Sequence, residues 1–181
     1  MKARRFVTAA LTCIAIVSLQ AHAATPQAIA VSGSVVQTCT TWTPSGSLTF
    51  SPTYDVFSNT APAGSASLTT RCTKGAAVTF AVNGGQNYSH ASPSGFRAMT
   101  DGSSHYLSYQ LYQSADLSAA WGFSTSTGAG TTLNQTGLGN AAGETMTLSL
   151  FGQIPAKQDV FVSSSSKTLQ YQDTVIVTVN Y

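Results

Sequence analysis

Residues 170–181 read QYQDTVIVTVNY and form the most strand-like stretch of the chain. Apolar and polar residues alternate along it and β-branched residues dominate, which is typical of a strand with one buried face. The residues expected on that buried face are Val175, Val177, Val179 and Tyr181. Because no turn follows in the sequence, we expect that no later segment covers the free edge of this strand.

The first 24 residues are typical of a secretory signal. Lys2, Arg4 and Arg5 precede an apolar run at 6–19, and Ala21-His22-Ala23 fits a cleavage site. At about 14 residues the apolar run is too short to span a bilayer, and no later stretch reaches the roughly 20 residues that spanning requires. We therefore expect an exported, soluble protein.

The exported part of the chain carries little charge. Three of the eight basic residues lie in the signal segment, which leaves five against six acidic residues and a net charge of −1. Such a surface has nothing to attract nucleic acid or an anionic membrane. Weak charge together with abundant Ser, Thr, Gly, Asn and Gln favours association between molecules. We therefore expect no nucleic acid as a partner, and a surface that permits assembly with other proteins.

Two cysteines remain once the signal segment is removed. Cys13 lies within that segment, whereas Cys39 and Cys72 enter an oxidising compartment, where we expect them to form a disulfide. A metal site is the alternative for two thiols, but no His or Cys lies at ligand spacing beside either residue. Closing a loop of this length stabilises the folded state by about 3–4 kcal/mol in the chain-entropy model.

The exported chain is expected to be one all-β domain without an internal repeat. Most apolar segments alternate with period two, and helix formers are sparse. Asn83-Gly84-Gly85 predicts a turn, and Pro155 ends a strand because proline donates no ladder hydrogen bond. The strands predicted before the C-terminal one are 28–39, 47–50, 66–73, 77–82, 106–113, 145–154 and 160–162. Short strands joined by turns and one disulfide favour an antiparallel sandwich of immunoglobulin type, and we expect its usual closing strand to be missing.

No catalytic site is recognisable in the sequence. His90 and His105 lie in or beside a Ser/Gly-rich loop near Asp101, but no Gly-x-Ser-x-Gly elbow is present and nothing fixes a base beside a nucleophile. The six acidic residues show neither the spacing of a carboxylate pair nor that of a calcium loop. We expect no enzymatic activity, no cofactor and no metal. Asp173 is expected to be structural, through hydrogen bonds to a neighbouring turn.

Several motifs together resemble one known family. They are Leu48-Thr49-Phe50 with Tyr54-Asp55, Asn83-Gly84-Gly85, Phe96-Arg97-Ala98-Met99, Leu107-Ser108-Tyr109-Gln110-Leu111-Tyr112, Trp121-Gly122, Phe151-Gly152-Gln153-Ile154-Pro155 and the stretch 171–181, with Cys39 and Cys72. In this combination the chain resembles the spore coat protein U domain family, whose members include the pilins of Csu-type archaic chaperone-usher pili. The resemblance runs the length of the exported chain. Ser51-Pro52 departs from the family, which has Gly in several places in this loop.

The resemblance implies an incomplete immunoglobulin-like β-sandwich that lacks its C-terminal strand and is completed by donor-strand exchange. Residues 25–36 of one subunit are then the donor segment, which merges at Val35 and Val36 into the subunit's own first strand, and residues 37–181 form the domain. The expected donor residues are Ile29, Val31, Gly33 and Val35. The acceptor groove is expected along the terminal strand, at Val175, Val177, Val179 and Tyr181.

The implied partners are other copies of the subunit or related pilins, a periplasmic chaperone that holds the C-terminal strand, and an outer-membrane usher. The implied function is that of a structural subunit of a secreted surface pilus, with roles in adhesion and biofilm. One alternative is a spore or cell-surface coat protein. Another is a tip adhesin that stacks sugars on Trp42, Trp121 and tyrosines. Simpler interpretations also stand, namely an ordinary terminal strand at 170–181 and an ordinary first strand with a frayed tail at 28–36.

Overall fold

The computed structural model describes residues 27–40, 43–44, 47–123, 130–162 and 169–181. The predicted signal segment and Trp42 lie outside these residues. The chain divides into two units, residues 1–34 and residues 35–181. In the first unit, the described residues form no helix or strand, and the side chains of Ile29 and Val31 are 86% and 91% exposed.

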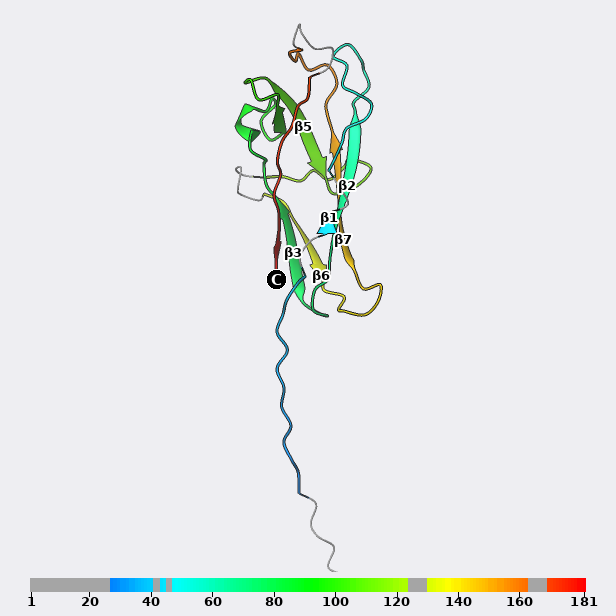
Figure 1. The fold of residues 1–181 in the computed structure, drawn as a ribbon, viewed down its shortest axis with the longest axis vertical. Helices are drawn as coiled ribbons and strands as arrows, with labels where there is room; N and C mark the ends of the chain where they lie inside the picture. The colour runs from blue at the N-terminus through cyan, green and yellow to red at the C-terminus, as the bar shows by residue number, and fades with distance from the viewer. Residues whose placement is uncertain (1–26, 41–42, 45–46, 124–129, 163–168) are drawn as a thin grey trace, which may run out of the picture. The chain divides into compact units, whose positions relative to one another are not determined.

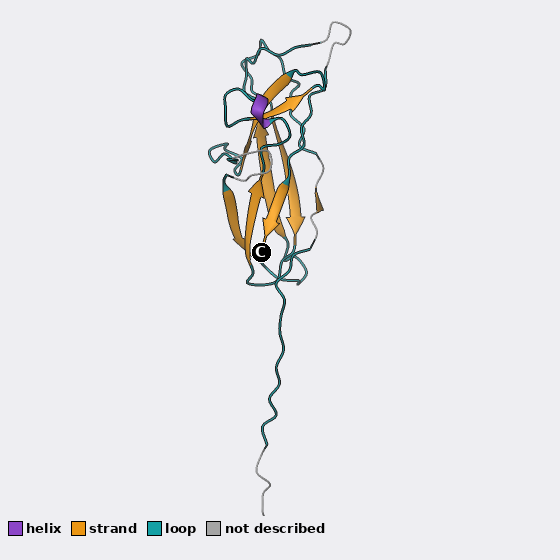
Figure 2. Ribbon diagram, turned by 90° about the vertical axis from the view of Figure 1, so that its left-hand side faces the viewer, coloured by secondary structure: helices purple, strands orange, loops and turns teal. Residues whose placement is uncertain are grey.

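Two antiparallel sheets make up the second unit (Figure 1, Figure 2). The larger sheet has the strand order β1-β2-β7-β5-β4, and the smaller one has the order β6-β3-β8. The strands are β1 (Thr43–Pro44), β2 (Ala63–Thr70), β3 (Ala77–Val82), β4 (Arg97–Thr100), β5 (Tyr106–Tyr112), β6 (Thr132–Thr136), β7 (Met146–Gln153) and β8 (Val177–Asn180). Within the described ranges, the single helical element is the 3-10 turn η1 (Tyr88–His90). The all-β sandwich predicted from the sequence is therefore confirmed.

The larger sheet is built on the eight-residue pairing of β2 with β7, in which Gly64 lies opposite Gly152. A Cβ atom on Gly64 would lie 2.2 Å from the carbonyl oxygen of Thr49, and one on Gly152 would lie 3.0 Å from the ring of Phe50. The contact at Gly64 is too close for any side chain, and the one at Gly152 would require the Phe50 ring to shift. The two glycines therefore allow the segment before β2 to pack directly on the sheet.

β3 is the central strand of the smaller sheet, and its inward face supplies Val78, Phe80 and Val82 to the core. These side chains are between 0% and 1% exposed. In the pairing with β8, Val179 lies opposite Phe80 and Val177 lies opposite Val82. The inward face of β3 thus continues onto β8, as the period-two pattern of both strands predicts.

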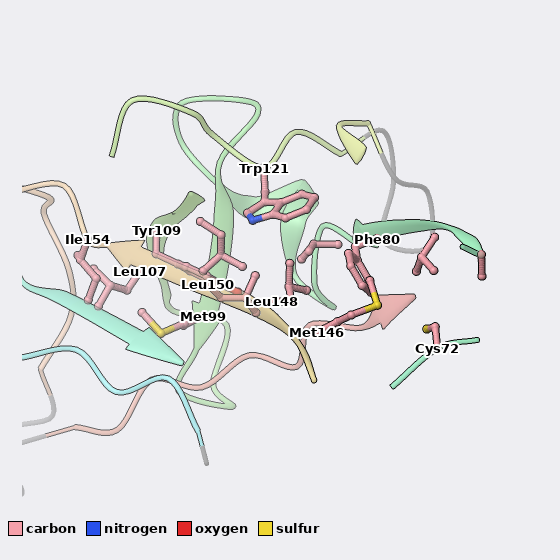
Figure 3. Close-up of a cluster of buried hydrophobic side chains, with 14 residues drawn as sticks. Cys72, Phe80, Met99, Leu107, Tyr109, Trp121, Met146, Leu148, Leu150 and Ile154 are labelled. Carbon is pink, nitrogen blue, oxygen red and sulfur yellow. The ribbon is translucent and has the colours of Figure 1, made fainter. Parts of the chain in front are cut away.

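The core contains side chains from both sheets (Figure 3). Phe80 comes from the smaller sheet, whereas Leu148 and Leu150 come from the larger one. Trp121, from the segment after β5, is fully buried in the same cluster. Complete burial of so large a side chain makes Trp121 a packing residue of the domain.

A disulfide joins Cys39 to Cys72, with an S–S distance of 2.07 Å. Residues 38–40 and 71–73 form backbone hydrogen bonds on both sides of this bridge. The chain that enters the domain is therefore tied, covalently and by hydrogen bonds, to the segment that links β2 to β3.

Three strand predictions agree closely with the structure. β3 has the predicted bounds, and β5 and β7 lie within one residue of the predicted ranges 106–113 and 145–154. The predictions for 47–50 and 160–162 were wrong, because these residues form no strand. β4 and β6 were missed, because neither shows a clear apolar alternation.

Two predicted strands are much shorter than expected. Residues 28–38 form no strand, and Val35 and Val36 are 86% and 77% exposed. At the C-terminus, β8 covers only 177–180 of the predicted 170–181. The preceding residues cross from one sheet to the other, since Gln172 pairs with Thr100 of β4 before β8 pairs with β3.

Candidate functional site

The C-terminal strand β8 has a free edge. It pairs with β3 along four residues and lies at the end of the smaller sheet, as Figure 1 shows for the red segment beside β3. In the part of the chain that the structure describes, no strand pairs with its other side. The N–H and C=O groups of an unpaired edge are a template for an additional strand.

The inward side chains of the C-terminal segment are incompletely covered. Val175, Val177 and Val179 are half-buried and pack against the core. Tyr181, predicted on the same face, follows the end of β8 and is 54% exposed. Further apolar side chains that contact the core but keep some exposure are Leu48, Phe50, Tyr54, Leu68, Leu133, Val160 and Tyr171. Among the described residues, the core therefore keeps apolar side chains with some exposed surface.

Asp173 anchors the C-terminal segment to the rest of the domain. Its Oδ2 accepts a hydrogen bond from the Tyr109 hydroxyl at 2.7 Å, and its Oδ1 accepts one from the Gln86 amide at 2.9 Å. The predicted contact between Asp173 and a neighbouring turn is therefore confirmed. Gly85, in that turn, has φ +78°, and a Cβ atom there would lie 2.0 Å from Asp173 Oδ2.

Asn83 provides a second anchor at the end of β3. Its side-chain Oδ1 accepts hydrogen bonds from the Ile176 amide at 2.8 Å and from the Gly85 amide at 3.1 Å. The backbone N–H of Asn83 donates to the Ile176 carbonyl at 3.0 Å. The asparagine side chain thus takes the place of a backbone acceptor and extends the β3–β8 pairing beyond the ladder.

Arg97 of β4 is fully buried behind this anchor. Its Nε donates to the Asn83 carbonyl at 2.9 Å, and its Nη1 donates to Gln110 Oε1 and to the Trp121 carbonyl, both at 2.9 Å. The guanidinium lies 4.7 Å from the centre of the Phe123 ring. Nη2 has no hydrogen-bond partner in the described parts of the chain, and neither has the indole nitrogen of Trp121.

The electrostatics of this region follow from burial. Desolvation lowers the pKa of Arg97 from 12.5 to about 10, and the proximity of Tyr109 and Asp173 offsets part of the effect. Arg97 is therefore charged at neutral pH. Burial, and then the carboxylate of Asp173, raise the pKa of Tyr109 well above its ordinary value, so its hydroxyl stays protonated and donates to Asp173.

The two described histidines take part in ring stacking. His105 Nδ1 lies 2.6 Å from Asp101 Oδ2, and its ring stacks on Phe161 at 4.0 Å. His90 stacks on Tyr106 at 4.1 Å.

Within the described ranges, no group of three or more His, Cys, Asp or Glu residues is arranged to hold a metal ion. In the same ranges, no helix has the length and apolar character needed to cross a membrane.

A comparison with protein families gives a match to the Spore Coat Protein U domain over residues 25–178. The chain belongs to this family. Seven chains of solved structures also match the protein. One is in the crystal structure of the CsuC-CsuE chaperone-tip adhesion subunit pre-assembly complex from archaic chaperone-usher Csu pili of Acinetobacter baumannii. It shares 16% identity with a TM-score of 0.46, and the match covers 81% of this chain and 40% of that one. The present chain therefore spans less than half of that relative's length. No curated protein matches.

In this Spore Coat Protein U domain protein, the motifs noted in the sequence converge on the C-terminal segment. Asn83, Arg97, Tyr109 and Asp173, which we call the anchoring network, come from four motifs that are far apart in the chain. Among these four residues, only Asp173 was predicted from the sequence to have a structural role. A signal for Arg97 was available, since it lies between apolar residues in a chain with few charges. Trp121, considered as a sugar-stacking residue, has no exposed surface.

Proposed function

We propose that this chain is a structural subunit of a cell-surface pilus, assembled with a periplasmic chaperone and an outer-membrane usher by donor-strand exchange. The observation that carries the proposal is the free edge of β8, with Val175, Val177 and Val179 half-buried beside it. An edge of this kind takes up an extended segment, which adds backbone hydrogen bonds and covers the apolar side chains.

The N-terminal segment has the properties of the strand that is needed. Ile29, Val31 and Val35 share one face of an extended chain and are 86%, 91% and 86% exposed. Gly33 falls on the same face and provides a position without a side chain. Full burial of the three apolar side chains is worth on the order of 5–9 kcal/mol, at about 1.5–3 kcal/mol each. Ladder hydrogen bonds add about 1 kcal/mol each.

A subunit with a donor segment at one end and an acceptor edge elsewhere forms head-to-tail contacts. Such contacts are heterologous and do not close, so they generate a filament. An unfilled apolar edge also favours aggregation, which is the physical reason for a chaperone before assembly. The resulting pilus accounts for the proposed surface location and for the proposed roles in adhesion and biofilm.

The experiment places charges on one face of the donor segment. The full chain carrying Ile29→Asp and Val31→Asp is compared with the full chain carrying Ala28→Asp and Ala30→Asp, which adds the same charges on the opposite face. Both are produced with the chaperone and usher, and polymers are scored on unheated SDS gels and by electron microscopy. We expect wild-type and Ala28/Ala30 chains to form SDS-resistant ladders, and the Ile29/Val31 chain to remain monomeric. Ladders of equal length from both variants, or none from wild type, would contradict the proposal.

A further inference from the structure

The C-terminal segment has few backbone contacts of its own. Gln172 exchanges two backbone hydrogen bonds with Thr100 of β4, both 2.9 Å long, and β8 pairs with β3 along only four residues. A four-residue strand with one partner is a weak element in isolation. Between these two attachments, one backbone bond, from the Asn83 amide to the Ile176 carbonyl, is joined by side-chain bonds of Asp173 and of Asn83.

We infer that Asp173, Tyr109, Asn83 and Arg97 are positioning residues that hold β8 in place as an acceptor edge before any strand is added to it. The inference rests on the proposed function for the role of β8 as acceptor, but the positioning itself concerns the single subunit. The network bonds the residues just before β8 to Asn83, which follows β3, and to Tyr109 of β5. Arg97 of β4 acts through Asn83, because its Nε donates to the Asn83 carbonyl.

Burial makes these contacts strong. Arg97 is 0% exposed and Tyr109 is 4% exposed, so their hydrogen bonds do not compete with bulk water. The carboxylate of Asp173 accepts two backbone amides besides the Tyr109 hydroxyl, the second being that of Thr174 at 2.8 Å. Charge-assisted bonds of this kind are stronger than neutral ones. They fix the segment immediately before β8, and with it the register of the β3–β8 pair.

The network also suppresses one motion, the detachment of β8 from β3. With the network intact, β8 stays paired with β3 while its other edge is free, so an incoming strand meets a preformed edge. Without it, β8 must first be ordered, which lowers the affinity for the donor because only part of the population is competent to bind.

The test uses hydrogen exchange in a full chain that carries Ile29→Asp and Val31→Asp, so that assembly does not protect the edge. Asp173→Asn and Tyr109→Phe are introduced separately, with Tyr112→Phe in the same strand as a matched control. We expect the amides of β8 to exchange about tenfold faster or more in the Asp173 and Tyr109 variants. Those of β2 and β7 should change little, and Tyr112→Phe should leave β8 unaffected. A peptide with the sequence of residues 25–36 should bind more weakly to the Asp173 and Tyr109 variants than to the parent chain, and equally well to the Tyr112 variant.

The outcomes separate the two claims. Unchanged exchange in β8, or acceleration that is equal in β8, β2 and β7, would overturn the positioning role. Suppose that hydrogen exchange accelerates only in β8, and that the peptide binds neither the parent chain nor any variant. The positioning role then stands, and the proposed donor-strand exchange fails. If Asp173→Asn does not fold, Tyr109→Phe still decides, because it removes one hydroxyl and keeps the ring.

Discussion

The hydroxyl of Tyr109 donates a 2.7 Å hydrogen bond to the carboxylate of Asp173, across 64 positions of sequence. This contact joins β5 of the larger sheet to the segment that precedes β8. Burial, and then the proximity of Asp173, raise the pKa of Tyr109, so its hydroxyl stays protonated as the donor of this bond.

The first prediction concerns this bond. Tyr109→Phe removes the donor and leaves one oxygen of Asp173 without its buried partner, so we expect the free energy of unfolding to fall by about 1–2 kcal/mol. Urea unfolding measures the change, with an unaltered m-value. Tyr112→Phe, in the same strand, should change stability by less than about 0.5 kcal/mol. Equal effects at both positions would show that the Tyr109 hydroxyl has no specific role.

The second prediction separates backbone strain from steric overlap. Gly85 and Gly75 both have positive φ, of +78° and +80°, but a Cβ atom meets Asp173 at 2.0 Å only at Gly85, and nothing within 4 Å at Gly75. Gly75→Ala should therefore lower the free energy of unfolding only by the cost of placing an alanine at positive φ, about 1–2 kcal/mol. Gly85→Ala should cost more, because Asp173 must also move. Thermal unfolding of the two variants provides the comparison, and equal losses would argue against close packing at the turn.

The third prediction concerns Arg97. Lysine has no planar fork, so Arg97→Lys keeps the charge but cannot bond Asn83, Gln110 and Trp121 together. We expect a loss of about 2–4 kcal/mol, since a buried charge then lacks partners. Arg71→Lys, at a half-buried position, is the control and should be nearly neutral. Chemical denaturation of both variants measures the difference, and a stable Arg97→Lys protein would exclude the proposed geometry of the fork.

The fourth prediction concerns acid stability. Desolvation alone would raise the pKa of Asp101, but hydrogen bonds from the His105 side chain and from the Ser103 and His105 amides outweigh it and lower the pKa below 3.8. The unfolded chain therefore takes up this proton first as the pH falls. The contribution of the ionised Asp101 carboxylate to folding stability is complete above about pH 4, and it is lost as the pH falls through the lowered pKa of Asp101. Stability measured between about pH 2 and 5 should depend less on pH in Asp101→Asn than in wild type. Identical slopes would rule out this contribution.

The sequence predicted the strands whose two faces differ in polarity. β3 and β7 alternate cleanly, because one face of each lies on the core, and their bounds were found within a residue. β6 was missed because it is an edge strand with Leu133 as its single apolar residue. β4 was missed because Arg97, a charged residue, occupies a buried position, and its partners come from distant segments that no local pattern reveals.

In the candidate site, too, features set by local alternation were predictable, and features set by contacts with distant segments were not. The inward face of Val175, Val177 and Val179 was predictable from alternation, and the structure places it against the core. The length of β8 was not, because the crossing between sheets depends on Thr100 and Asn83, residues far away in sequence. The donor role of Ile29, Val31, Gly33 and Val35 stays a prediction, since the described N-terminal segment is exposed and unpaired.

The disulfide has a mechanical consequence for a filament of the proposed kind when it is pulled at its ends. Tension entering the domain through residues 35–38 reaches Cys39 and passes covalently to Cys72, 33 positions further along. Residues 40–71, including β1 and β2, are thereby excluded from extension. The load falls instead on β3 and the strands paired with it, so a subunit stretched in single-molecule experiments should gain less contour length when oxidised than when reduced.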